Sequence, residues 1–383
     1  DHRDLHSFPT RRSSDLHFNG IYVAYTFLMI TLAVNFFVLY KGISKGIETL
    51  AKIAMPLLFL FAIIIAIRVL TLGTPDPSVP ENSVSNGFGF IWNPDFTALW
   101  DPKIWLAAAG QIFFTLSVGM GTIHAYASYL KPKDDIALSG LTTAATNEFA
   151  EVILGGSIAI PAAIAFFGVT ATVQMATGGA FDIGFASLPL VFERIPLGQY
   201  FVFMWFLLLF FAGITSSVAM GQPLVAFLED EFKFSRKQAV GILAMVVFLA
   251  VHLVVFYLKF GFLDEMDYWA GTFGLVVFAL IETVLFIWVF GPEKAWAEIN
   301  DGGDIKIPRV FFYLMKFVTP VVLFGIMIWW FINDAIPILF LENTPPENVP
   351  YVWGARLLLV GIYVALALMV RKAWQLNRSN HGS

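Results

Sequence analysis

The stretch WLAAAGQIFFTLSVGMGTIHAYASY, residues 105–129, is apolar enough to cross a bilayer, but its centre is unsuited to a continuous helix. Thr115, Ser117, Gly119 and Gly121 fall between two apolar halves. Glycine lowers helix stability by roughly 1 kcal/mol relative to alanine, and hydroxyls offer the backbone alternative partners. A break inside the membrane must be satisfied by protein, water or an ion. The stretch predicts either two half-helices meeting at an ion and substrate site or a helix with small residues for close packing.

The composition of the 383 residues indicates a multi-pass membrane protein. It is 58% hydrophobic and 13% charged, whereas soluble domains carry about 25% charged residues. The absence of cysteine excludes disulfides and thiolate metal sites. We find no phosphate-binding loop, no dinucleotide fingerprint and no basic run for nucleic acid. The sequence therefore predicts neither an organic cofactor nor a nucleic-acid partner.

Nine segments are long enough to span a bilayer, which takes about 20 residues. They are 18–40, 47–71, 105–129, 138–168, 197–228, 237–258, 265–290, 309–332 and 352–371. Residues 1–16 are polar and resemble adapter-derived sequence, so we exclude them from the fold. We expect one transmembrane domain over 17–375 and a cytoplasmic tail over 376–383.

Lysine and arginine in the short loops predict the topology, because cytoplasmic loops are enriched in these residues. Positive charges follow the first, third, fifth, seventh and ninth spans, as with Lys41, Lys131, Arg236, Lys306 and Arg371. The C-terminus is then cytoplasmic and the first span begins outside. Because no signal sequence places it there, we expect upstream helices to be missing. Residues 292–304 read as a short interfacial helix.

Ionisable and polar residues inside spans are costly and point to function. Asn147 and Glu151 are four residues apart and share one helix face. The hydroxyls of Thr215 and Ser216 face the same side as the Ala212 carbonyl, so these oxygens could bind a hard cation. The alternatives are a solvated carboxylate at Glu151 and hydroxyls that bond back to helix carbonyls.

Acidic residues lie at two span ends, Glu265 and Asp267 at an outer end, and Glu229 and Asp230 at an inner end. Each pair could bind an arginine at a gate. The alternative is a solvated helix end.

Several ordered runs resemble the neurotransmitter:sodium symporters, specifically bacterial amino-acid transporters of the LeuT type. The runs are KGISKGIE at 41–48, GQIFFTLSVGMG at 110–121, LSGLTTAATNEFAEVILGGSIAIPAA at 138–163, FFAGITSSVA at 210–219 and LDEMDYWAG at 263–271. The resemblance implies an all-α membrane fold of the LeuT type with about nine transmembrane helices, corresponding to family helices four to twelve. One of them is discontinuous, and family helices one to three are absent.

The resemblance also implies roles for matching positions. The first sodium site takes Thr115 and Asn147, and the second takes the Ala212 carbonyl with Thr215 and Ser216. The substrate contacts are Phe114, Thr115, Ser117, Met120, Ser216 and Met220. Glu151 replaces a bound chloride or is proton-linked, Asp267 is the outer gate acid, Asp230 is the inner gate acid, and Gln222 lies at the inner gate.

Two pocket positions depart from the leucine-binding pattern. Met120 stands where that pattern has an aromatic residue, and Met220 where it has isoleucine. Methionine adapts its shape, so we expect a less selective side-chain pocket. Because the first broken helix of the family supplies other sodium and substrate contacts, we expect these 383 residues alone not to transport.

The parent protein is thus predicted to be a symporter of amino acids or related amines, driven by Na⁺ through alternating access, in the bacterial inner membrane. Its expected partners are the amino acid, Na⁺ at two sites as the only metal, and the lipid bilayer; a homodimer is left open. The alternative is a non-transporting receptor or scaffold on the same fold, which should lack the oxygen ligands. An enzyme is not expected, because the spans show no metal cluster or activated nucleophile.

Overall fold

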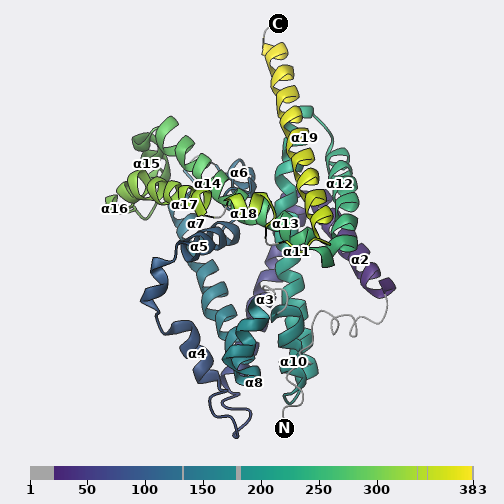
Figure 1. The fold of residues 1–383 in the computed structure, drawn as a ribbon. Coiled ribbons are helices and arrows are strands. Elements are labelled where there is room, and N and C mark those ends of the chain that lie inside the picture. The colour runs from purple at the N-terminus through teal and green to yellow at the C-terminus, as the bar shows by residue number, and fades with distance from the viewer. Residues whose placement is uncertain (1–20, 132, 178–182, 334, 343, 382–383) are drawn as a thin grey trace. The chain divides into compact units, whose positions relative to one another are not determined.

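The computed structural model describes residues 21–131, 133–177, 183–333, 335–342 and 344–381, and these residues form helices joined by loops (Figure 1). The first half contains α2 (Ile21–Gly42), η1 (Ile43–Ile47), α3 (Glu48–Leu70), α4 (Val84–Trp92), η2 (Phe96–Trp100), α5 (Pro102–Thr115), α6 (Thr122–Ala127), α7 (Ile136–Glu148), η3 (Phe149–Gly155), α8 (Gly156–Thr177), η4 (Ile183–Ser187) and α10 (Leu188–Glu193). The second half contains α11 (Gly198–Phe232), α12 (Arg236–Tyr257), η5 (Leu258–Phe260), α13 (Phe262–Met266), η6 (Asp267–Phe273), α14 (Gly274–Val284), η7 (Leu285–Val289), α15 (Pro292–Asn300), α16 (Arg309–Tyr313), η8 (Leu314–Val318), α17 (Thr319–Asn333), α18 (Ala335–Leu339) and α19 (Val349–His381). The expected leader at 1–16 lies outside the described residues.

Contacts divide the chain into two compact units. Unit 1 contains the residues up to Asp95 together with Ala145–Val218, and unit 2 contains Phe96–Ala144 together with Ala219–Ser383. The boundaries fall inside α7 and α11, so each of these helices contributes to both units. The single transmembrane domain expected over 17–375 stays a prediction.

Seven helices in the described part of the chain are long and apolar enough to cross a membrane. The difference from the nine expected spans has two causes. Tyr22–Leu70 forms one run of 49 residues, about 74 Å at 1.5 Å per residue, which is more than twice the hydrocarbon core of a bilayer. It is interrupted at Gly42, whose φ is 85°, and thus contains the first two expected spans. The third expected span is divided into short helices.

That third span confirms the predicted break. Helix α5 ends at Thr115 and α6 begins at Thr122. Between them Ser117, Gly119 and Gly121 have φ values of 57°, 78° and 74°. This left-handed region is open to glycine but costs an L-residue such as serine roughly 1–2 kcal/mol. The segment is therefore two half-helices rather than a closely packed continuous helix.

The core of unit 1 forms where α8 meets α3, α4, α10 and the first half of α11. It includes the fully buried side chains Ile65, Ile158, Leu188 and Phe192. Helix α4 approaches α8 so closely that a Cβ at Gly87 would lie 2.5 Å from the Cα of Pro161. Helix packing in lipid depends on such close contact, because the hydrophobic effect does not drive association there.

The core of unit 2 holds α5 in place before its break. Val276 on α14 and Leu323 and Ile326 on α17 form its centre, and Leu106 and Phe113 of α5 pack against them. The half-helix that leads into the break is therefore held against two other helices.

The predicted short helix over 292–304 is present as α15, which ends at Asn300 before Gly302 with φ 73°. Its location at a membrane interface stays a prediction. The Asp135 carboxylate accepts hydrogen bonds from the backbone N–H groups of Leu138 at 2.7 Å and Asp304 at 2.8 Å. These bonds hold the pKa of Asp135 below its ordinary value. A charged carboxylate thus joins the start of α7 to the segment after α15 within unit 2.

Candidate functional site

The break between α5 and α6 packs against α14 and the unit 2 part of α11. A Cβ at Gly121 would lie 3.7 Å from the Cβ of Pro223 on α11. A Cβ at Gly119 would lie 3.1 Å from the carbonyl oxygen of Leu275 and 3.1 Å from the Cβ of Phe278, both on α14. The glycines thus bring irregular backbone, with carbonyls released from the helix pattern, close to α11 and α14. Such backbone is tolerated at membrane depth only where it is buried in protein or lines a polar cavity.

Five of the six predicted substrate contacts lie in or just before the break, or on the part of α11 that packs against it, whereas Ser216 lies in unit 1. Phe114, Thr115, Ser117 and Met120 belong to α5 or to the break itself, and Met220 lies one turn before the Pro223 contact on α11. These five residues belong to unit 2. Their roles as substrate contacts stay predictions.

In unit 1, α11 gathers the oxygens predicted for the second sodium site. The Thr215 hydroxyl donates to the carbonyl of Phe211 at 2.7 Å and lies 3.1 Å from that of Ala212. Thr215 is half-buried and Ser216 is exposed. The Ala212 carbonyl and the Thr215 hydroxyl therefore lie on one side of the helix. The same bonds are the local back-bonding typical of membrane helices, and both interpretations stay open.

Asn147 and Glu151 lie on adjacent turns where the helix widens. Asn147 is in α7, and Glu151 is in η3, a π-helical stretch over Phe149–Gly155. Both side chains are half-buried in unit 1. Widened turns are frequent at functional sites, but unit 1 and unit 2 contain six such stretches, so the turn alone does not define a site.

The sodium ligands predicted from the sequence are divided between the units. Thr115 lies in unit 2, whereas Asn147, Ala212, Thr215 and Ser216 lie in unit 1. All five offer hydroxyl, amide or carbonyl oxygens, the ligand chemistry that suits a hard cation such as Na⁺. No cluster of three or more histidine, aspartate or glutamate side chains able to hold a metal occurs among the described residues.

A polar network around one buried glutamine lies at the predicted inner end of α11. The Gln222 side chain is fully buried and accepts a hydrogen bond of 2.8 Å from the Arg236 guanidinium. The same guanidinium pairs with Glu229 at 2.9 Å. Gln222 and Glu229 are seven residues apart, so they lie on one face of α11. The arginine expected for the inner acidic pair thus contacts Glu229, and Asp230 is exposed.

We expect Arg236→Ala to lower the unfolding temperature of the full-length protein by about 2–4 °C, because hydrogen bonds to charged groups contribute about 1.5–3 kcal/mol. Unfolding in detergent can be followed by tryptophan fluorescence. The neighbouring exposed residue gives the control Lys237→Ala. Equal unfolding temperatures for the two variants would contradict a stabilising network.

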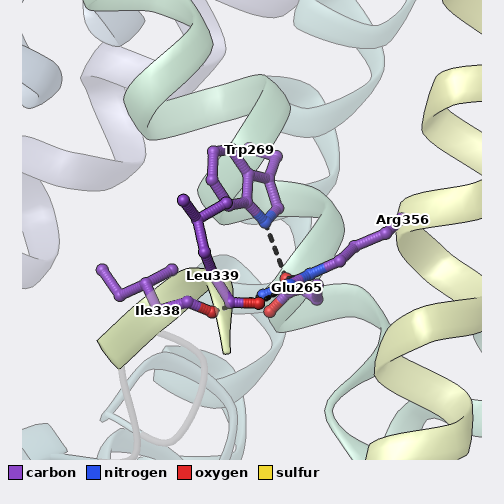
Figure 2. A network of polar contacts seen from close by, with 5 residues as sticks. All are labelled: Glu265, Trp269, Ile338, Leu339 and Arg356. Carbon is purple, nitrogen blue, oxygen red and sulfur yellow. Dashed lines mark hydrogen bonds and ion pairs between the residues drawn. The ribbon is translucent and has the colours of Figure 1, made fainter. Parts of the chain in front are cut away.

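At the predicted outer end of α13, an arginine contacts Glu265. Arg356 of α19 forms an ion pair with this carboxylate at 2.5 Å, and the two side chains are only 10% and 14% exposed. Figure 2 shows Arg356 reaching Glu265 and the end of α18. Asp267 is exposed, at the start of the π-helical stretch η6. The pairing expected at this end is therefore present, but its acid is Glu265.

The sequence interpretation missed two ionisable residues of the spans, Arg356 and Glu282. Glu282 lies on α14, 3.8 Å from His124 of α6. The signal was available in both cases, because a charged residue within an apolar span is rare and marks a functional or paired position.

The chain is similar in sequence to known sodium-dependent transporters. The model of the sodium:neurotransmitter symporter family matches residues 11–376. The uncharacterized sodium-dependent transporter MJ1319 of Methanocaldococcus jannaschii is 29% identical over 91% of this chain and 69% of its own length. The human sodium- and chloride-dependent neutral and basic amino acid transporter B(0+) is 26% identical over 83% of this chain and 50% of its own.

Among solved structures, MhsT in complex with L-phenylalanine superimposes with a TM-score of 0.67 at 27% identity. The superposition covers 78% of this chain and 66% of MhsT. The chain thus spans between half and about two thirds of the length of these relatives.

Proposed function

The chain belongs to the sodium:neurotransmitter symporter family, and on this premise we propose that the full-length protein couples Na⁺ entry to the uptake of an amino acid. It is a multi-pass membrane protein, which we place in a bacterial inner membrane with its C-terminus in the cytoplasm. The observation that carries the proposal is the break between Thr115 and Thr122. It lies against α11 and α14, where half-helix ends can meet a substrate and an ion.

Two sodium sites would supply the driving force. We propose Thr115 and Asn147 for the first site, and Ala212, Thr215 and Ser216 for the second. A tenfold Na⁺ gradient and a potential of 100 mV together provide roughly 3.7 kcal/mol per ion. A single ion would therefore suffice to concentrate an amino acid by a few hundredfold.

An amino acid is the substrate class favoured by two relatives. One is named as a neutral and basic amino acid transporter, and the other was solved with L-phenylalanine. We place the substrate at the break beside Phe114 and Ser117, with its side chain toward Met120 and Met220. Two flexible methionines would accept side chains of different shape.

The acidic residues complete the proposal. Asp267 would close the outer gate, and Asp230 with Gln222 would act at the inner gate. Glu151 would supply the negative charge that chloride supplies elsewhere in the family, or would bind a proton. Alternating access would follow if Na⁺ and substrate bind the outward-open and closed states with different affinity.

The test is uptake of labelled amino acids by proteoliposomes that contain the full-length protein. We expect saturable uptake that requires an inward Na⁺ gradient and stops when an ionophore dissipates it. Replacing external Na⁺ by K⁺ is the control. Equal uptake in the two salts, or saturable substrate binding without any flux, would overturn the proposal, and the second result would favour a receptor.

A further inference from the structure

Arg356 is a buried arginine in an apolar helix, and each of its three guanidinium nitrogens has a partner. Nε donates to the Glu265 carboxylate at 2.5 Å, Nη1 to the carbonyl of Leu339 at 2.7 Å, and Nη2 to that of Ile338 at 2.6 Å. Arg356 as a whole residue is buried. Placing such a charge in a span is costly, and an arginine so paired within a span is a candidate for a functional role.

The same guanidinium contacts the residues at the two ends of one helical turn, Glu265 and Trp269. Oε1 of Glu265, which accepts the Arg356 bond, also accepts a 2.6 Å hydrogen bond from the Trp269 indole (Figure 2). The guanidinium carbon lies 5.6 Å from the centre of the Trp269 ring, within the range of a cation–π contact. Glu265 and Trp269 are one turn apart, and Asp267 lies between them in the chain.

The direction of the Asp267 side chain is set by a glycine in its own helix. A Cβ at Gly271 would lie 2.6 Å from Oδ1 of Asp267, so the glycine leaves room for the carboxylate to lie along the next turn. The Asp267 side chain is exposed. Its direction therefore depends on how the turn from Glu265 to Trp269 is held.

We propose that Arg356 is a positioning residue for Asp267. Through its contacts with Glu265 and Trp269, Arg356 holds the start of η6 in place. This orients the Asp267 carboxylate for closure of the outer gate. This inference rests on the proposed function, in which Asp267 is the gate acid. A merely structural Arg356 would cap the end of α18 and stabilise the fold without affecting closure.

The labelling rate of one introduced cysteine distinguishes a positioning role of Arg356 from a purely structural role. The 383 residues contain no cysteine, and Ala270 is exposed one turn beyond Asp267. Ala270→Cys is introduced into full-length protein free of other cysteines, and its labelling by an impermeant methanethiosulfonate reagent is measured in Na⁺ with and without L-phenylalanine. With Arg356 intact, we expect the amino acid to slow labelling about tenfold, within the usual range of coupling between sites.

In Arg356→Gln we expect this protection to fall to about twofold or less, since the coupling between substrate and gate is lost. The half-saturating Na⁺ concentration measured with the same label should change little. Arg371→Gln on the exposed face of α19 is the control and should keep full protection. A structural role would reduce the amount of folded protein but leave the protection of the folded fraction intact.

Glu265→Gln provides a second test that does not depend on the folding of Arg356→Gln. It removes the charge pair but leaves Arg356 its two carbonyl partners. We expect it to lose protection as well. Full protection in every variant that folds would overturn the inference. If Ala270→Cys with Arg356 intact shows neither protection nor Na⁺-driven uptake, the proposed function itself fails.

Discussion

Replacing Thr215 with valine is expected to raise the Na⁺ concentration for half-maximal uptake at least tenfold. Valine keeps the β-branched shape and removes only the hydroxyl, so the helix should be retained. An oxygen that contacts a charged partner contributes about 1.5–3 kcal/mol, and every 1.4 kcal/mol is tenfold in affinity. The measurement is initial uptake by proteoliposomes over a range of Na⁺ concentrations at constant ionic strength.

Two variants separate a sodium ligand from a back-bonded hydroxyl. Thr283 on α14 donates to the carbonyl of Ala279 at 2.7 Å, the local bond that Thr215 makes to Phe211. Thr283→Val should therefore leave the Na⁺ dependence unchanged, and Thr215→Ser should keep it within about threefold, because its hydroxyl remains. If Thr215→Val behaves like Thr283→Val, Thr215 is only back-bonded and the second sodium site is misplaced.

The helical elements were largely predictable because apolar length and glycine placement are local signals. The break after Thr115 follows from four residues within seven positions, and the structure confirms it. The helix at α15 was predicted in the same way. The joining of the first two expected spans into one helical run from Tyr22 to Leu70 was not predicted. Only Gly42, with its positive φ, interrupts that run, and composition does not reveal a residue's backbone angle.

The partners of the acidic residues were only half predictable. The sequence indicates that the acidic pairs Glu265/Asp267 and Glu229/Asp230 could each bind an arginine, and in the structure Glu265 and Glu229 do so. It does not indicate which arginine, because Arg356 is 91 residues from Glu265. Periodicity describes one helix at a time, whereas such pairs depend on the packing of distant helices. The π-helical turns at Glu151 and Asp267 likewise have no simple sequence signal.

The sodium ligand sets were assigned by resemblance and not by geometry. Their oxygens are of the right type, but Thr115 and Asn147 belong to different units. The spacing of residues within one helix does not determine which residues of other helices share an ion with it. The Na⁺ titration of Thr215→Val is therefore informative, because it examines one ligand without assuming the others.

Gly119→Ala is expected to reduce the maximal uptake rate at least tenfold. Alanine at a φ of 78° carries a strain of about 1–2 kcal/mol. Its methyl group would also lie 3.1 Å from the Leu275 carbonyl and from Phe278, so the break must move away from α14. A shift of about 1 Å in a positioned site can reduce turnover by about a hundredfold. Uptake is measured at saturating Na⁺ and amino acid and normalised to the folded protein recovered.

Gly110→Ala is the matched control, nine residues earlier in α5. There a Cβ meets only Thr272 at 3.5 Å, an ordinary contact, and alanine favours a helix by roughly 1 kcal/mol. Gly110→Ala should therefore unfold at an equal or higher temperature and transport normally. If Gly119→Ala also transports at the parent rate, the break tolerates a displaced backbone, and its contact with α14 does not set the substrate site. A loss confined to Gly119→Ala would show that the irregular backbone itself, rather than the apolar half-helix leading into it, is required for transport.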